Sequence, residues 1–583
     1  MGPDFVRVLR SALLCGVVAL AVGCSAGAHS RPVVEFPNPA ALAAIAARPA
    51  ARPPVEEADV PTDGWTVEVG DPNAAVEAWQ PRDLWDRTFA AAKGDHRARL
   101  TRPMSCVARE IGRYLLAHQA APPHELQQFI NAACGAAVVQ IGFQTLSGSL
   151  PPGAKDEAML ASAQPEIERR LISRLPAEAS EVGFAFGRLG GQMLVAMAFA
   201  SSDAELSPFS LVPDGTGEVA IEGVLHEEAQ SFAGYVNHGR FAVSPCFVDP
   251  TVERPRFRIA CKVDPADQRA WIQLVYAPPK RVLARPFAQI LARRNEQVAL
   301  TYTLPVYAEP HGDPQAAPNA QEFAQAVVTE LNRVRAQGGL AAVRLNLDET
   351  ASATQVATHY FAAAFGRGQP TDADTIALAL LAGWHVAGMI RDGSFVSSLL
   401  PHTRDAARWL ASTLEMPLGR SALMMEGIEE IALGPVVLDH PDALGAVVVG
   451  YRLHHGNDHA DDVKRLLIRT VQARRRMKLP PPTRLGDMQV VMQAELARVN
   501  QGTAQPMEAL QRVLSRGVNQ FGADMRGYVV EATSLDALEI PAEVLAQPKL
   551  VLEIGVTHHK PQGAAWAQFV ILVIFVDQHT TRA

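Results

Sequence analysis

Apolar residues recur at helical spacing through the middle of the chain, where residues 322–337 place one at every third or fourth position. This spacing predicts an amphipathic helix with one face on a core. Asn319 and Glu322 form a capping-box pattern at its start. The glycines at 338–339 end it, because glycine adopts the left-handed conformation at little cost. A second helix is predicted to end near residue 365.

Three stretches end in the same order of elements: a helix-rich part, a strand of acidic, apolar and glycine residues, a turn and a second apolar strand. These strand pairs are 181–191 and 193–199, 429–434 and 447–451, and 552–557 and 569–576. The repetition predicts an α/β (α+β) fold class in which one layout is used three times in tandem. For the first stretch, an unrelated α/β domain that ends in a hairpin explains the pattern as well.

Residues 209–308 have a different texture, with alternating apolar and polar positions at 218–225, 257–263 and 271–276. Alternation with period two, punctuated by proline and glycine, is typical of strands. We therefore predict an additional β-rich, sandwich-like module here.

Residues 1–24 have the pattern of an export signal, in which two arginines precede an apolar run. The run ends in Ala-Val-Gly-Cys, which resembles a bacterial lipobox, so Cys24 is predicted to be lipidated and to anchor the chain. Ser25 after it favours the outer membrane. An ordinary signal peptide cut after Ala26 or Ala28 is the alternative. No other apolar run has the ~18–20 residues that span a bilayer.

Composition divides the rest of the chain. Residues 25–84 are rich in alanine and proline, which predicts an extended spacer. The predicted divisions are signal peptide 1–24, linker 25–84, N-terminal α/β domain 85–208, β-rich domain 209–308, central domain 318–456 and C-terminal α/β domain 457–583.

Beyond the signal and Cys24, four cysteines remain, and they allow three pairings. Two close pairs separated by a long gap favour the local disulfides Cys106–Cys134 and Cys246–Cys261. Each would contribute ~3 kcal/mol to stability in the chain-entropy account. Neither pair has the CxxC spacing of a redox or zinc motif.

The run LNRVRAQGGLAAVRLNLDETASATQVATHY, residues 331–360, has a helix carrying Asn and Arg, a Gly-Leu turn and a second helix ending on histidine. In this it resembles the opening of the CAP superfamily, the domain of cysteine-rich secretory and pathogenesis-related proteins. Residues 408–412, 430–434 and 445–451 resemble that family's later helix and closing strands. The resemblance implies α-β-α sandwich modules and an exported protein, without fixing a reaction.

The family's cavity gathers two histidines and two glutamates. His359 stands at the first histidine position, and His385 and Glu430 are the other candidate cavity residues. Trp384 replaces a carboxylate, however, and Gly419 replaces the second histidine. Because a divalent metal needs several converging ligands, we predict no catalytic residue, no metal and no cofactor at this cavity.

The segment 454–462 is the richest in possible metal ligands, with His455 and His459 as weak candidates. It has the composition of an exposed inter-domain loop, so a solvating role is favoured. Residues 463–478 form a basic amphipathic helix that either docks on a neighbouring domain or touches anionic lipid or cell-wall polymer.

The net charge of −8, with mixed signs along the chain, argues against nucleic-acid binding. We predict a non-enzymatic cell-envelope lipoprotein, held to the membrane through Cys24, whose degenerate CAP-like domains bind an envelope protein, polysaccharide or lipid. Two alternatives stay open: a metal-dependent or cell-wall-directed hydrolase that uses His359, Glu430 or the 454–459 patch, and a lipid-binding protein.

Overall fold

The structure, a computed structural model, describes residues 36–51, 64–68, 79–149, 156–189, 191–229, 231–278, 284–303, 305–307, 319–400, 405–437, 444–455, 458–521, 525–532, 535, 538, 540–561 and 564–576. The predicted signal and Cys24 lie outside these residues. The chain divides into two compact units, Met1–Leu381 with Gly393–Gly450, and Ala382–Asp392 with Tyr451–Ala583.

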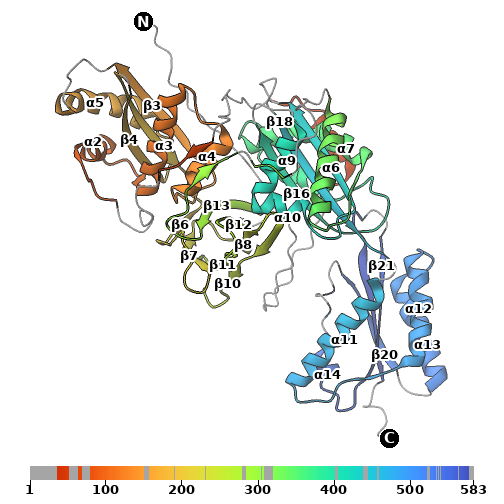
Figure 1. The fold of residues 1–583 in the computed structure, drawn as a ribbon. Helices are drawn as coiled ribbons and strands as arrows, with labels where there is room; N and C mark the ends of the chain where they lie inside the picture. The colour runs from red at the N-terminus through yellow and green to blue at the C-terminus, as the bar shows by residue number, and fades with distance from the viewer. Residues whose placement is uncertain are drawn as a thin grey trace. The chain divides into compact units, whose positions relative to one another are not determined.

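One four-stranded sheet recurs three times with the same strand order. We call these copies repeats 1, 2 and 3 (Figure 1). From edge to edge the strands are β2 (Arg99–Leu100), β4 (Glu181–Leu189), β5 (Gln192–Ala200) and β3 (Gly142–Ser149); β15 (Arg344–Leu345), β17 (Glu430–Val437), β18 (Leu444–Leu453) and β16 (Ile390–Leu400); and β19 (Thr483–Arg484), β21 (Val551–His559), β22 (Gln568–Val576) and β20 (Met525–Ala532). In each repeat the short first strand runs parallel to its neighbour.

Helices occupy equivalent places between these strands. Repeat 1 has α2 (Leu84–Lys93), α3 (Arg102–His118), α4 (His124–Ala133) and α5 (Asp156–Arg170). Repeat 2 has α6 (Ala320–Gln337), α7 (Leu347–Ala364), α8 (Asp372–Leu381), α9 (Ala406–Glu415) and α10 (Pro417–Leu423). Repeat 3 has α11 (Asp458–Arg476), α12 (Gly486–Asn500), α13 (Pro506–Phe521) and α14 (Ala542–Leu545). The predicted α/β fold class is confirmed.

The central strand β22 is buried between two helical layers, which explains why it is apolar from Phe569 to Val576. In β22, Phe569, Ile571, Val573 and Phe575 belong to one core cluster together with Leu466 of α11. The intervening Val570, Leu572 and Ile574 belong to a second cluster with residues of α12 and α13. Figure 1 shows these helices on opposite faces of the sheet. The arrangement is an α-β-α sandwich.

The β-rich region forms two four-stranded sheets around one core, as predicted. The first contains β6 (Ala204–Leu206), β7 (Glu218–Leu225), β10 (Phe247–Val248) and β11 (Arg256–Lys262). The second contains β8 (Ser231–His238), β9 (Ala242–Pro245), β12 (Arg269–Ala277) and β13 (Arg285–Arg293). Both predicted disulfides are present: Cys106–Cys134 joins α3 to the end of α4, and Cys246–Cys261 lies in the β-rich core.

The expectation of an extended spacer is wrong for part of the linker. Helix α1 (Pro39–Ala46) is capped by the Asn38 side chain and begins with proline, whose fixed φ suits the first helical turn. Leu42 and Ile45 are buried, and α1 contacts α7 and α8. Further along, β1 (Trp65–Thr66) pairs with β14 (Thr301–Tyr302). Within the described residues, no helix has both the length and the apolar character needed to cross a membrane.

Candidate functional site

The three repeats align residue by residue on their short parallel strands. The equivalent strand pairs are Leu100 with Val182, Leu345 with Ile431, and Arg484 with Leu552. The helix that follows begins at the same distance from the strand in each repeat, at the first residue of α3, α7 and α12. Counted along these helices, the candidate residue His359 corresponds to Tyr114 in repeat 1 and to Arg498 in repeat 3.

Glu430, a predicted cavity carboxylate, holds the start of α7 against the sheet. Its side chain lies 2.9 Å from the Arg344 guanidinium and accepts a hydrogen bond of 3.0 Å from the Asn346 side-chain nitrogen. Asn346 also caps α7 by accepting from the Glu349 backbone N–H at 3.0 Å. This arrangement makes Glu430 a structural residue at the strand–helix junction.

Repeat 1 contains the same device. Arg99 lies 3.5 Å from Glu181, and Thr101 caps α3 by accepting from the Met104 backbone N–H. Burial raises the pKa of Glu181, while Arg99 and a hydrogen bond from Thr101 act in the opposite direction. Repeats 1 and 2 therefore share this Arg–Glu–cap arrangement, whereas no side chain caps α12 in repeat 3.

His359 is buried, with 7% of its surface exposed, and it lies under the linker helix α1. Its ring donates a hydrogen bond to the backbone carbonyl of Ala46. Next to it, Arg48 forms an ion pair of 2.8 Å with Asp372 of α8. Burial is the largest cause of a lowered pKa for His359, followed by the charge of Arg48; Asp372 and the Ala46 hydrogen bond raise it. The position is thus filled from within the chain.

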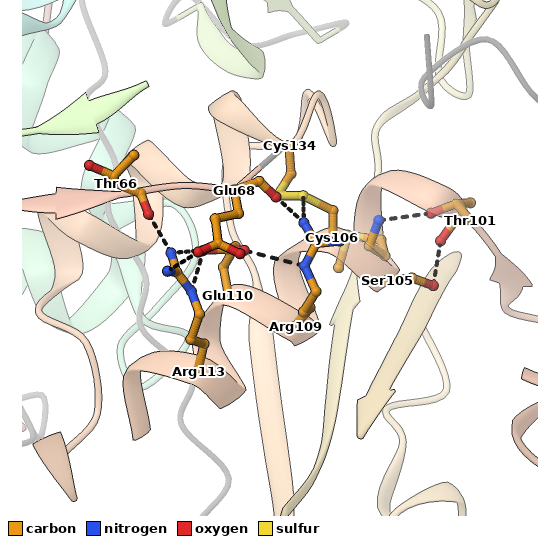
Figure 2. The surroundings of a disulfide bond; sticks show 10 residues. Thr66, Glu68, Thr101, Ser105, Cys106, Arg109, Glu110, Arg113 and Cys134 are labelled. Atoms are coloured by element: carbon orange, nitrogen blue, oxygen red, sulfur yellow. Dashed lines mark hydrogen bonds and ion pairs between the residues drawn. A yellow bond between two sulfur atoms is a disulfide. The ribbon is translucent and has the colours of Figure 1, made fainter. Parts of the chain in front are cut away.

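The equivalent position in repeat 1, Tyr114, is covered by a second linker segment. Figure 2 shows Thr66 and Glu68 of this segment beside Arg109 and Arg113 of α3. The Trp65 ring packs edge-on against Tyr114 with centroids 5.1 Å apart, and the Arg113 guanidinium lies 4.4 Å from the Trp65 ring centre. Arg113 also donates to the Thr66 carbonyl and to the Glu68 carboxylate, the latter at 2.8 Å.

Beside Arg113, the Arg109 guanidinium donates to the Glu68 carbonyl and lies near the Cys106–Cys134 disulfide (Figure 2). Both arginines pair with Glu110, which is fully buried. One buried carboxylate therefore orients two cations toward the linker.

The remaining predicted residues lie elsewhere. His385 is exposed in the loop before β16. His455 is exposed, whereas the His459 ring contacts the buried His558 ring through Nε2 and Nδ1. His454 also stacks on His558, with the two ring centroids 3.4 Å apart. Burial lowers the pKa of His454 to about 3.

The prediction that 454–462 is an exposed loop is therefore wrong in part. Helix α11 begins at Asp458, and Asp462 is buried. His558 was missed because no local pattern connects it to His454, far away in the chain. Separately, His238, Asp264 and Asp267 of the β-rich module have ligand atoms within 4.8 Å of one another. None of the predicted metal candidates belongs to that group.

Sequence reasoning also missed a partly buried charged cluster where repeat 1, the β-rich module and repeat 2 meet. Glu125 of α4 lies 3.9 Å from Arg408 of α9, and Trp271 of β12 donates to Glu415 at 3.2 Å. Burial raises the pKa of both glutamates and lowers that of His124 to about 4. Polar contacts in this cluster therefore connect repeat 1, the β-rich module and repeat 2.

No protein-family model matches the chain, and no curated protein matches it. Solved structures that overlap it include a cysteine-rich secretory protein from Staphylococcus aureus subsp. aureus Mu50, with 10% identity, 43% of this chain and 88% of that chain covered, and a TM-score of 0.18. Another is an extracellular protein containing a SCP domain from Bacillus anthracis str. Ames, with 12% identity, 52% and 93% covered, and a TM-score of 0.19. Similarities this low carry no argument about family or function. The helices and sheets of the chain itself define an α/β protein.

Proposed function

We propose that this protein is a non-enzymatic cell-envelope lipoprotein, anchored through Cys24, in which degenerate CAP-like domains act as a binding scaffold. The proposal includes the predicted division into linker, three α/β modules and β-rich module. One observation carries it: in repeats 1 and 2, the helix position of the expected cavity histidine is covered by the chain's own linker. A catalytic residue needs access to its substrate, and these positions are instead used to hold polypeptide.

The engagement of Glu430 supports the same conclusion. Its carboxylate serves Arg344 and the capping residue Asn346, and among the contacts of the described residues none joins it to His359. The acid and the histidine that a hydrolase would combine thus have separate structural partners.

The test is metal content and hydrolase activity of the full chain beside the variants His359→Ala and Cys24→Ser. We expect no stoichiometric divalent metal that depends on His359 and no hydrolysis of peptidoglycan or peptide substrates. Cys24→Ser should move the protein from the membrane fraction to the soluble fraction and abolish labelling by a palmitate analogue. Stoichiometric metal lost in His359→Ala, or hydrolysis lost with it, would overturn the scaffold proposal. Unchanged membrane attachment in Cys24→Ser would overturn the lipid anchor.

A further inference from the structure

Repeats 1 and 2 show what the helix after the short strand holds on its outer side. In repeat 1, α3 holds residues 65–68 through Arg109, Arg113 and Tyr114. In repeat 2, α7 and the start of α8 hold α1 and Arg48 through His359 and Asp372. Different linker segments thus converge on one helix position.

The two contacts share a mode of recognition. A side chain of the helix donates to a main-chain carbonyl of the segment: Arg113 to Thr66, and His359 to Ala46. A buried or packed anchor residue accompanies it, Trp65 in one repeat and Ile45 in the other. An ion pair of 2.8 Å completes each contact, with opposite polarity: in repeat 1 Arg113 of the helix pairs with Glu68 of the segment, and in repeat 2 Arg48 of the segment pairs with Asp372 of α8.

Repeat 3 has the same helix, and no helix or strand of the described residues makes extensive contact with its outer side. By the alignment on the short strands, Arg109, Arg113 and Tyr114 correspond to Gln493, Ala497 and Arg498 of α12. One turn earlier, Val490 is 72% exposed, although its large apolar side chain would normally be covered. We define the α12 face as Val490, Gln493, Ala494, Ala497 and Arg498. Among the described residues, the extensive contacts of α12 are with α13 and β21.

The edge of the α12 face is basic. Arg498, Arg512 and Arg516 all lie within 3.8 Å of the buried Glu495, and Arg512 also pairs with Glu508. Three guanidiniums share two carboxylates at this edge, so one positive charge is in excess there, whereas the exposed Asp487 adds a negative charge one turn before Val490, at the other end of the face. The Arg498 side chain is 41% exposed and stands where Tyr114 and His359 meet the linker in the other repeats. An excess cation beside an apolar strip favours an acidic partner.

We propose that the α12 face binds a short polypeptide segment of a partner protein that carries an apolar anchor and an acidic side chain. The anchor covers Val490 and Ala497, Arg498 donates to a main-chain carbonyl of the segment, and the acidic group lies toward the arginine edge. This proposal rests on the scaffold function above and names its class of partner: an exported or envelope protein with an exposed acidic-apolar segment.

The probe is a fluorescein-labelled peptide of residues 62–70, Thr-Asp-Gly-Trp-Thr-Val-Glu-Val-Gly, which contains the segment that repeat 1 already holds. Fluorescence anisotropy measures its binding to the full chain, whose own copy of this segment occupies α3. We expect saturable binding that weakens at least tenfold in Val490→Asp and severalfold when the peptide carries Glu68→Lys. High salt should weaken it further, since exposed charges are screened.

The matched control is Ile468→Asp, which places the same charge on another exposed apolar residue of the same unit. It should leave peptide binding unchanged, and circular dichroism should show both variants folded. Absence of saturable binding at millimolar peptide would overturn the proposal. So would binding that Val490→Asp leaves unchanged, because the peptide would then be exchanging at α3. Neither result alters metal content or hydrolase activity, so a failure here is distinct from a failure of the scaffold proposal.

Discussion

Two arginines with no exposed surface occupy equivalent positions near the ends of the first helices of repeats 2 and 3. Arg335 of α6 and Arg474 of α11 each donate to the carbonyl six residues later in the chain, Ala341 and Pro480. Each also donates to two backbone carbonyls at a short helix. These are Leu423 and Met425 at the end of α10 in repeat 2, and Leu545 and Gln547 at the end of α14 in repeat 3. A buried charge is tolerated when such hydrogen bonds replace its hydration.

Replacing Arg474 by alanine should destabilise repeat 3 by about 3 kcal/mol, because several buried carbonyls lose their donor at once. Arg474→Lys should lie between alanine and wild type, since a single ammonium cannot span the same acceptors. Urea unfolding measures both. Arg475→Ala, on the exposed side of the same helix, should cost less than about 0.5 kcal/mol. Equal losses for Arg474→Ala and Arg475→Ala would contradict a structural role for the buried guanidinium.

Glu415, at the end of α9, links pH to the stability of the first unit. Burial raises the pKa of its carboxyl, against the hydrogen bond from Trp271 and the charges of Arg269 and Arg420. The folded state therefore binds the proton more tightly than the unfolded chain, whose glutamate pKa is about 4.3. The stability that the protonated form contributes is complete below that pH and is lost as the pH rises through the folded pKa.

Glu415→Gln should remove this loss, because the amide oxygen still accepts from Trp271 and does not ionise. Its free energy of unfolding should match wild type at pH 4 and exceed it at pH 8, measured by urea unfolding at both values. The exposed Glu253→Gln should show no such pH-dependent gain. A wild type that gains stability from pH 4 to pH 8 relative to Glu415→Gln would show that the sign is wrong.

At the scale of elements, the sequence pattern predicts those helices and strands that depend on interactions between neighbouring residues. Asn319 caps α6 as expected, and the apolar run at the C-terminal end is the buried strand β22. Predictions failed where the partner is remote. Alanine and proline near α1 suggested a spacer, yet the helix is ordered by packing on α7 and α8, which no local pattern reveals. Likewise, the sequence predicts Glu430 as a cavity residue, whereas strand register places it beside Arg344.

The docking of α1 depends on few buried residues, so one charge should release it. Ile45→Asp places a carboxylate against α7 and α8 at a cost of several kcal/mol, more than so short a helix gains on docking. Hydrogen-exchange mass spectrometry should show residues 39–46 losing protection while the sheets keep theirs. Ala44→Asp puts the same charge on the exposed side of α1 and should preserve protection. Continued protection of 39–46 in Ile45→Asp would contradict this account of docking.

At the scale of the whole molecule, the three repeats share one layout but differ in what contacts the helix that follows the short strand. Repeats 1 and 2 share a unit with the β-rich module and use linker segments to cover their outer helices, whereas repeat 3 belongs to the second unit. The repetition was predictable, because the order of strands and glycines is local. The charged cluster that the three modules share was not predictable, because Glu125, Trp271 and Arg408 lie far apart in the sequence.

The division into units predicts how the molecule responds to reduction. Both disulfides lie in the first unit, and the described residues of the second unit contain none. Closing loops of 28 and 15 residues stabilises a chain by roughly 3.5 and 3 kcal/mol in the entropic account. Calorimetry with reductant should therefore lower the unfolding temperature of one transition by several degrees and leave the other in place.

Paired variants assign these transitions. Cys246→Ser with Cys261→Ser, and Cys106→Ser with Cys134→Ser, should each lower the same transition that reductant lowers, whereas Arg474→Ala should lower the other. If the two perturbations act on separate transitions, repeat 3 unfolds on its own. We expect this of a separate module that carries the α12 face. A single transition that shifts with every variant would mean instead that the two units unfold together, and that the open helix of repeat 3 is stabilised by the rest of the chain.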